Sequence, residues 1–165
     1  MNTLTSQQDF RQAMRSLVST VTVISAAGND RRQAMTATSV GSLSLEPPAL
    51  YVSVNRITGL HDLLARGAPF CLNVLNAGQQ PVADACSRPP TGDHRFNIGQ
   101  WAVRDQTPYL ADAACNVFCT VGPSMDYATH TLFVGEVSRI LINAETPVLL
   151  YGEGKYQSSP NNGSD

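Results

Sequence analysis

Alternation of apolar and polar residues predicts most of the regular structure of this chain. The alternating segments are rich in β-branched side chains, which favours strands over helices. We predict about seven strands, at Thr20–Ala26, Gln33–Ser44, Ala49–Asn55, Pro69–Leu75, Ala113–Val121, His130–Ile142 and Pro147–Tyr151.

Three segments show helical spacing of their apolar residues instead. The first, Gln7–Leu17, follows a Ser6–Asp9 pair with the spacing of a capping box. The second, Thr58–Arg66, has Thr58 as its predicted N-cap and ends at a glycine. The third, Gln79–Cys86, carries a proline in its first turn.

The remaining segments are predicted from glycine, proline and polar residues. Ser87–His94 is expected to be a surface loop, and Gly122–Asp126 a turn. Phe96, Ile98 and Trp101 are expected to pack the loop onto the strands. The polar residues 158–165 are expected to form a disordered tail after a single domain over residues 1–157.

Strands outnumber helices, so the pattern predicts a mainly β fold, a closed barrel with short helical crossovers. The 165 residues are enough for one domain with a core of its own. The net charge of −2 comes without a basic stripe, which argues against nucleic-acid binding. There is no apolar run long enough to cross a bilayer, so no membrane association is expected.

The cysteines and the N-terminus indicate a cytoplasmic protein. The four cysteines, Cys71, Cys86, Cys115 and Cys119, form no Cys-x-x-Cys pair. We therefore expect buried free thiols rather than a metal site, and metal ligands are predicted at no position. The first residues have neither the basic start nor the apolar centre of a signal peptide.

The segment Met35–Thr58 carries the candidate chemistry. Its first half is rich in small residues and hydroxyls, and its second half is a strand that ends in Asn55-Arg56. Small side chains let a planar ligand approach the backbone, and hydroxyls with an arginine can bind a phosphate. An ordinary threonine-rich strand on a solvated sheet face explains the same pattern.

This segment resembles the flavin-binding segment of the flavin reductase family, which supplies reduced flavin to two-component monooxygenases such as phenol and 4-hydroxyphenylacetate hydroxylases. The likeness continues through Phe70–Leu75, Arg95-Phe96 with Trp101, Thr129-His130 and Gly154-Lys155-Tyr156. It implies a split β-barrel, a homodimer with flavin near the subunit interface, and delivery of diffusible reduced flavin to a monooxygenase component.

The resemblance also implies a flavin site, for FMN or FAD. Thr36, Ala37, Thr38, Ser39 and Val40 would run along the isoalloxazine ring, with backbone N–H groups facing its polar edge. The phosphate would be held by Ser42, Asn55, Arg56 and Thr58. Phe70 and Asn73 would border the ring or the ribityl chain. Taken singly, Arg56 is better explained as a solvated surface charge and Asn73 as a backbone cap, but their register with the segment Met35–Thr58 favours the flavin site.

His130, Lys155 and Tyr156 are the residues that the resemblance implies for nicotinamide binding, with His130 as the catalytic residue. Hydride transfer from NADH or NADPH requires two stacked rings and exclusion of water. His130 would position the rings and supply a proton. A histidine that satisfies a turn carbonyl at a strand end remains the alternative, as does a strand cap for the other two residues.

The chain departs from the family pattern beside Thr58. Relatives often carry Ser or Thr where this chain has Ile57 and Gly59, so Thr58 is the only hydroxyl left there. We therefore expect loose phosphate binding, as suits flavin used as a substrate. Ala128 stands where relatives have glycine before the histidine.

The resemblance implies an NAD(P)H:flavin oxidoreductase. No glycine-rich dinucleotide motif opens a helix after a strand, so the nicotinamide would bind transiently over the flavin. Two alternatives remain open: a flavin-binding electron carrier without catalytic activity, and a flavin oxidase of related barrel fold similar to pyridoxamine phosphate oxidase.

Overall fold

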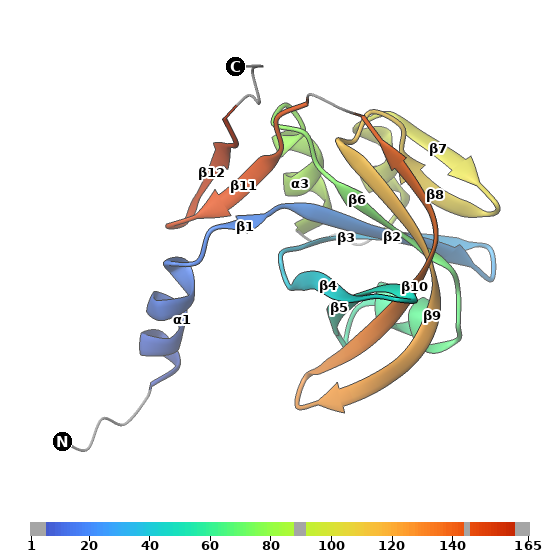
Figure 1. Cartoon of the computed structure of the whole chain (residues 1–165), viewed down its shortest axis with the longest axis horizontal. Coiled ribbons are helices and arrows are strands. Elements are labelled where there is room, and N and C mark those ends of the chain that lie inside the picture. Colours follow the sequence, from blue (N-terminus) through green and yellow to red (C-terminus); the bar gives the residue numbers. More distant parts are fainter. Residues whose placement is uncertain (1–5, 88–91, 144–145, 161–165) are drawn as a thin grey trace.

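The protein is a mainly β structure with three α-helices around it in the part of the chain described by a computed structural model, residues 6–87, 92–143 and 146–160 (Figure 1). The strands are β1 (Ser19–Thr20), β2 (Thr22–Gly28), β3 (Arg31–Ala37), β4 (Val40–Leu45), β5 (Pro48–Asn55), β6 (Phe70–Val74), β7 (Trp101–Arg104), β8 (Thr107–Leu110), β9 (Cys115–Tyr127), β10 (His130–Ile142), β11 (Leu149–Gly152) and β12 (Lys155–Ser158). The helices are α1 (Gln7–Arg15), α2 (Gly59–Ala65), α3 (Gln80–Ser87) and the 3-10 helix η1 (Asp93–Asn97).

One seven-stranded antiparallel sheet organises the molecule, in the order β3-β2-β6-β9-β10-β5-β4. Strands β3 and β4 follow one another in sequence yet lie at opposite edges, so the sheet must curve back on itself. The Ser53 amide donates to the Ser39 carbonyl at 3.0 Å, where the chain passes from one edge to the other. Within the described ranges no ladder joins β3 to β4. The mainly β prediction is confirmed, while full closure of the barrel is not found there.

The curvature of the sheet requires a glycine on β10. A Cβ atom at Gly135 would lie 2.6 Å from the Phe70 ring, so a side chain there would displace the centre of the core. Register shifts on either side of this residue add local twist to the β9–β10 pair. The core inside the curved sheet is built from fully buried apolar side chains, among them Ile24, Val52 and Phe133.

A second apolar cluster lies under α3 and the β7–β8 hairpin. It includes Val21, Leu75 and Phe96, with Trp101 packed against it. The Phe96 and Trp101 ring centroids are 4.6 Å apart. The small sheet β1-β11-β12 borders this cluster, and Figure 1 shows α1 extending away from the body beyond β1.

Local sequence signals fix the helix starts. Ser6 and Asp9 form the predicted capping box, and Thr58 is the N-cap of α2. Helix α1 ends at Arg15, two residues before the predicted end, and none of its residues is buried. The β10 strand has the predicted bounds, His130–Ile142.

Several sequence predictions are corrected by the pairing of strands. The segment predicted as the turn Gly122–Asp126 belongs to β9, because it pairs with β10, and the reversal occurs at Ala128, whose φ is 49°. The predicted strand Gln33–Ser44 is divided into β3 and β4. Strands β1, β7, β8 and β12 were not predicted, since each has only two to four residues.

The predicted loop and tail fall partly outside the described residues. Positions 88–91 of the loop lie outside, while Asp93 and His94 begin η1. Positions 161–165 of the tail also lie outside. Ser158 closes β12, and the Ser159 amide donates to the Val148 carbonyl at 3.0 Å, so the start of the predicted tail is ordered. Among the described residues, no helix is both long and apolar enough to span a membrane.

Candidate functional site

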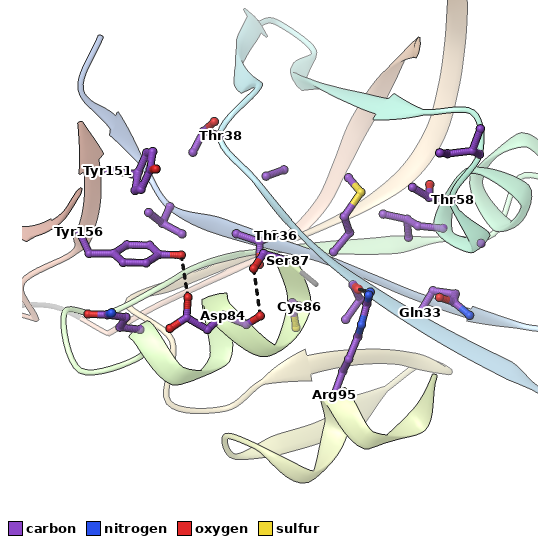
Figure 2. Close-up of a pocket in the computed structure, with 18 of the residues that line it drawn as sticks. Gln33, Thr36, Thr38, Thr58, Asp84, Cys86, Ser87, Arg95, Tyr151 and Tyr156 are labelled. Atoms are coloured by element: carbon purple, nitrogen blue, oxygen red, sulfur yellow. Dashed lines mark hydrogen bonds between the residues drawn. The ribbon is translucent and has the colours of Figure 1, made fainter. Parts of the chain in front are cut away.

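A cavity of about 990 Å³ opens between β3, α3, the start of α2 and the β11–β12 hairpin (Figure 2). Its volume is at the upper end of the range for small-molecule sites. It is lined by Val21, Gln33, Ala34, Met35, Thr36, Ala37, Thr38, Ile57, Thr58, Gly59, Leu60, Gln80, Asp84, Cys86, Ser87, Arg95, Tyr151, Gly154, Lys155 and Tyr156.

Strand β3 and the Thr38 that follows it form the longest wall of this cavity. Six consecutive residues, Gln33 to Thr38, line it. Side chains of a strand alternate between two faces, so an interior strand would line one cavity with every second residue. Strand β3 is instead an edge strand. Its backbone edge, with N–H and C=O groups, can therefore face a ligand.

The opposite wall combines α3 with two tyrosines of the hairpin. The Thr36 hydroxyl donates to the Ala83 carbonyl at 2.7 Å and ties β3 to α3. The Tyr156 hydroxyl lies 3.4 Å from the Asp84 carboxylate. The Tyr151 and Tyr156 rings meet edge to face, with centroids 5.2 Å apart. This end of the cavity therefore offers aromatic surface to a ring.

Arg95 brings a buried positive charge to the cavity. Its side chain is 6% exposed, and one guanidinium nitrogen donates to the Ala34 carbonyl at 2.5 Å. Burial raises the pKa of the neighbouring Cys86 thiol to about 11, and the charge of Arg95 acts in the opposite direction. Cys86 is therefore a neutral thiol near neutral pH.

The start of α2 closes the cavity beside Gln33. The Thr58 hydroxyl donates to the Asn55 carbonyl at 2.8 Å and accepts the His61 amide at 3.3 Å. A Cβ atom at Gly59 would come within 3.0 Å of the Gln33 amide group. The glycine, at a position where relatives often carry Ser or Thr, thus leaves room for Gln33.

Six of the residues predicted from the sequence line the cavity together: Thr36, Ala37, Thr38, Thr58, Lys155 and Tyr156. Arg95 and Tyr151 were not assigned a role, although the Arg95-Phe96 pair carried part of the resemblance. Val40 lines a separate cavity of about 390 Å³, which Thr38 also borders. Ser39 and Ser42 are exposed and line neither of these two cavities.

Phe70 and Asn73, which were predicted to border the ring or the ribityl chain, lie in the core. Both residues are 0% exposed. The Asn73 amide donates to the Val23 carbonyl at 2.8 Å and accepts the Leu110 amide at 2.8 Å and the Asn116 amide group at 2.9 Å. Asn73 therefore joins four strands of the core, β2, β6, β8 and β9, and does not line the cavity.

Asn55, Arg56 and His130 lie together, outside the cavity lining. The Asn55 side chain accepts the Ile57 amide at 3.1 Å. Arg56 is about half exposed, and its guanidinium is 3.6 Å from the Asp126 carboxylate. His130 is exposed, is the register partner of Asn55, and has its Nδ1 atom 2.9 Å from the Thr129 hydroxyl. Asn55 and His130 lie on the outer face of the β5–β10 pair. Arg56 follows β5, and its partner Asp126 accepts the hydroxyl of the buried Thr131 at 2.6 Å.

The cysteine prediction is confirmed, and the metal prediction stays a prediction. Cys71, Cys86 and Cys119 are buried free thiols, and Cys115 is partly buried. Burial raises the pKa of Cys119 to about 12 and that of Cys71 above the usual range. In the described part of the chain, no group of three or more His, Cys, Asp or Glu side chains is placed to hold a metal ion.

Comparison with known proteins assigns the chain to a family. The chain belongs to the flavin reductase family, because the family model described as "Flavin reductase like domain" matches residues 14–160. The recognition made from the sequence is therefore confirmed.

Individual relatives agree with this assignment. The chain is 40% identical over 152 residues to the reductase component of the FADH(2)-dependent resorcinol hydroxylase of Rhizobium sp. (strain MTP-10005), covering 90% of this chain and 85% of that protein. It is 36% identical over 160 residues to the NADH:riboflavin 5'-phosphate oxidoreductase of Streptomyces pristinaespiralis, covering 93% and 89%.

A solved structure shows the same arrangement of strands. BorF, the flavin reductase component of a bacterial two-component tryptophan halogenase, superposes with a TM-score of 0.86 at 30% identity. The superposition covers 95% of this chain and 100% of that one.

Proposed function

We propose that this chain is an NAD(P)H:flavin oxidoreductase that reduces FMN or FAD and supplies the reduced flavin to a partner monooxygenase. The observation that carries the proposal is the cavity of about 990 Å³, which combines a strand edge, a buried cation and aromatic side chains. The names of the relatives, a hydroxylase reductase component and an NADH:riboflavin 5'-phosphate oxidoreductase, support the same activity.

The cavity lining fits a flavin. The small residues Ala37 and Thr38 let a planar ring approach the edge of β3. Backbone N–H groups along that edge would bind the polar rim of the ring and stabilise negative charge on it. Thr36 is tied to α3 by its hydroxyl, which holds this wall in place. When bound, the flavin supplies the chemistry of a two-electron acceptor from a nicotinamide.

The same cavity has room for a second planar ligand. About 990 Å³ is large for one small molecule, and the proposed reaction needs two rings stacked in near contact. Tyr156, with Lys155 beside it, would contact the nicotinamide nucleotide and help to exclude water. His130 remains proposed as the residue that positions the rings and supplies a proton, although it does not line this cavity within one chain.

Flavin is proposed to act as a diffusible substrate. Ile57 is 90% exposed and Gly59 has no side chain, so neither adds a hydroxyl beside Thr58. Fewer donors to the phosphate favour weak binding and release of the reduced product. Equilibrium dialysis measures this directly: a sub-micromolar dissociation constant for FMN contradicts the proposal.

A homodimer is proposed as the functional assembly. Large apolar side chains are exposed on α1 and on the outer face near His130, including Phe10 at 58% and Tyr127 at 78%. Such surfaces are typical of interfaces. Light scattering of the purified protein should give twice the chain mass, and the mass of one chain contradicts the dimer. A cytoplasmic location is also proposed, supported by four free thiols.

The decisive assay follows NADH oxidation with and without added flavin. Turnover that rises with added FMN or FAD is expected for a reductase with diffusible flavin. Fast turnover without addition would indicate a retained cofactor. Flavin binding without turnover on NADH or NADPH would contradict the proposal and favour the electron carrier or the oxidase.

A further inference from the structure

The two ends of the cavity differ in chemistry. Figure 2 shows Tyr151 and Tyr156 on one side, and Gln33, Thr58 and Arg95 on the other. The first end offers aromatic rings, whereas the second offers an amide, a hydroxyl and a guanidinium. A ligand with a flat ring at one end and an anion at the other would match both.

Contacts along β3 bring the groups of the polar end together. Arg95 donates to the carbonyl of Ala34. Gln33 precedes Ala34 on β3, and its side chain lies against Gly59 at the start of α2. Thr58 immediately precedes that start. The four residue steps from Ala34 to Thr38 span about 13 Å of extended chain, which separates the polar end from the tyrosine end.

Arg95 is held against the cavity wall. A guanidinium carries its positive charge on five N–H donors arranged in a planar fork. Arg95 is almost fully buried, and its hydrogen bond to the Ala34 carbonyl holds the guanidinium at the cavity wall. In such a water-poor site a charge attracts an anion more strongly than at the surface.

The charges around the cavity favour an anionic ligand. Among the residues that the structure describes, its lining includes two cations, Arg95 and Lys155, and one carboxylate, Asp84. That carboxylate faces the Tyr156 hydroxyl at the aromatic end. The polar end therefore has a cation and neutral donors.

Arg56, the arginine predicted for phosphate binding, is placed differently. It does not line the cavity, and its side chain is 49% exposed beside a carboxylate of β9, Asp126. Water and this carboxylate screen its charge.

We propose that Arg95 is the residue that binds the phosphate of the flavin, at the end of the cavity formed by Gln33 and Thr58, and that Arg56 has no part in it. The proposal rests on the proposed flavin reductase function, and it names the cation of that site. A charge-assisted, two-pronged contact to a phosphate contributes about 10- to 100-fold in affinity.

The test compares FMN with riboflavin, which lacks the phosphate. Dissociation constants for both are measured by flavin fluorescence titration of the wild-type protein and of Arg95→Gln and Arg56→Gln. Each variant is its own control, because damage to the fold lowers affinity for both ligands, while loss of a phosphate contact affects FMN alone. Arg95→Lys keeps the charge without the fork.

The wild-type protein is expected to bind FMN about 10- to 100-fold more tightly than riboflavin. Arg95→Gln should reduce this ratio to about one while riboflavin binding stays unchanged. The ratio for Arg95→Lys should lie between those of the wild type and Arg95→Gln. Arg56→Gln should keep the wild-type ratio.

Three results overturn the proposal. One is an equal loss of FMN and riboflavin affinity in Arg95→Gln, which would mean that Arg95 only braces β3. Another is a collapse of the ratio in Arg56→Gln. The third is an unchanged ratio together with a raised KM for NADH in Arg95→Gln, which would assign the charge to the nicotinamide nucleotide. A wild-type protein that binds neither flavin would overturn the proposed function itself.

Discussion

The two regions in which the sequence placed candidate residues are built differently. The wall Gln33–Thr38 faces a cavity and lies along a sheet edge, so consecutive residues contribute to it. The row of Asn55, His130 and Tyr127 lies on the outer face of interior strands. There, alternate residues such as Thr131 and Phe133 point into the core. An edge strand can present its backbone to a ligand, whereas an interior strand presents only side chains.

This difference assigns ligand binding and catalysis to two separate regions, although the resemblance implied one flavin site. The cavity wall has the shape to bind ligands, and the outer face has an exposed histidine beside exposed apolar side chains. If the proposed function is right, changes at the wall should abolish binding, and changes at the outer face should affect rate more than binding.

The largest effect is expected from filling the cavity. Thr38 is exposed and lines the cavity, so Thr38→Trp would place a large ring where a ligand lies without disturbing the core. We expect FMN-dependent NADH oxidation to fall at least about 1,000-fold, since both ligands would be excluded. Val103→Trp, at an exposed position of β7, is the matched control and should keep wild-type activity. Retained activity in Thr38→Trp would place the chemistry elsewhere.

A substitution at Asn73 should lower the stability of the fold and leave ligand binding at the cavity unchanged. Replacing its amide in Asn73→Leu leaves the Leu110 amide and the Val23 carbonyl without partners inside the core. The expected loss is about 3 kcal/mol in the free energy of unfolding, measured by urea denaturation. FMN affinity of the folded fraction should stay within about twofold of the wild type. A selective loss of FMN affinity with unchanged stability would return Asn73 to the binding site.

Burial of the Cys86 thiol beside the cavity should make the free energy of unfolding depend on pH. Burial raises the folded-state pKa of Cys86 to about 11, above its ordinary value of 9.0. The neutral thiol therefore contributes stability that is fully present below pH 9 and is lost as the pH rises through 11. Between pH 8 and pH 10.5, the wild type should lose about 2 kcal/mol more unfolding free energy than Cys86→Ala. Equal losses in the two proteins would show that the thiol is hydrated.

The sequence predicted what is decided by neighbours in the chain. The capping box at Ser6, the cap at Thr58 and the long β10 strand depend on short-range patterns, and all three are present. The continuation of β9 through Gly122 was missed because pairing with β10 outweighs the local preference of Gly-Pro-Ser for a turn.

The cavity could be predicted only in part, for a related reason. Thr36 to Thr38 are consecutive at the end of β3, so a single motif revealed them. Arg95 reaches the Ala34 carbonyl across 61 residues of sequence, and Tyr151 comes from a strand beyond β10. No periodicity links such positions, because their proximity is created by the packing of η1 and β11 around β3.

The smallest effect is expected at His130, on the outer face. Its imidazole is exposed and contacts the neighbouring Thr129 hydroxyl, so His130→Ala should leave the fold and the cavity intact. If the histidine positions the rings or supplies a proton, kcat for NADH oxidation should fall about 10-fold, while the FMN dissociation constant changes less than about twofold. His94→Ala, at another exposed histidine, should leave both values unchanged. Equal losses of rate and FMN affinity, or wild-type values for both, would contradict a role in catalysis and leave His130 as a strand-end residue. A selective loss of rate would mean that the outer face of the β5–β10 pair approaches bound ligand, as a homodimer that joins this face to a cavity would allow.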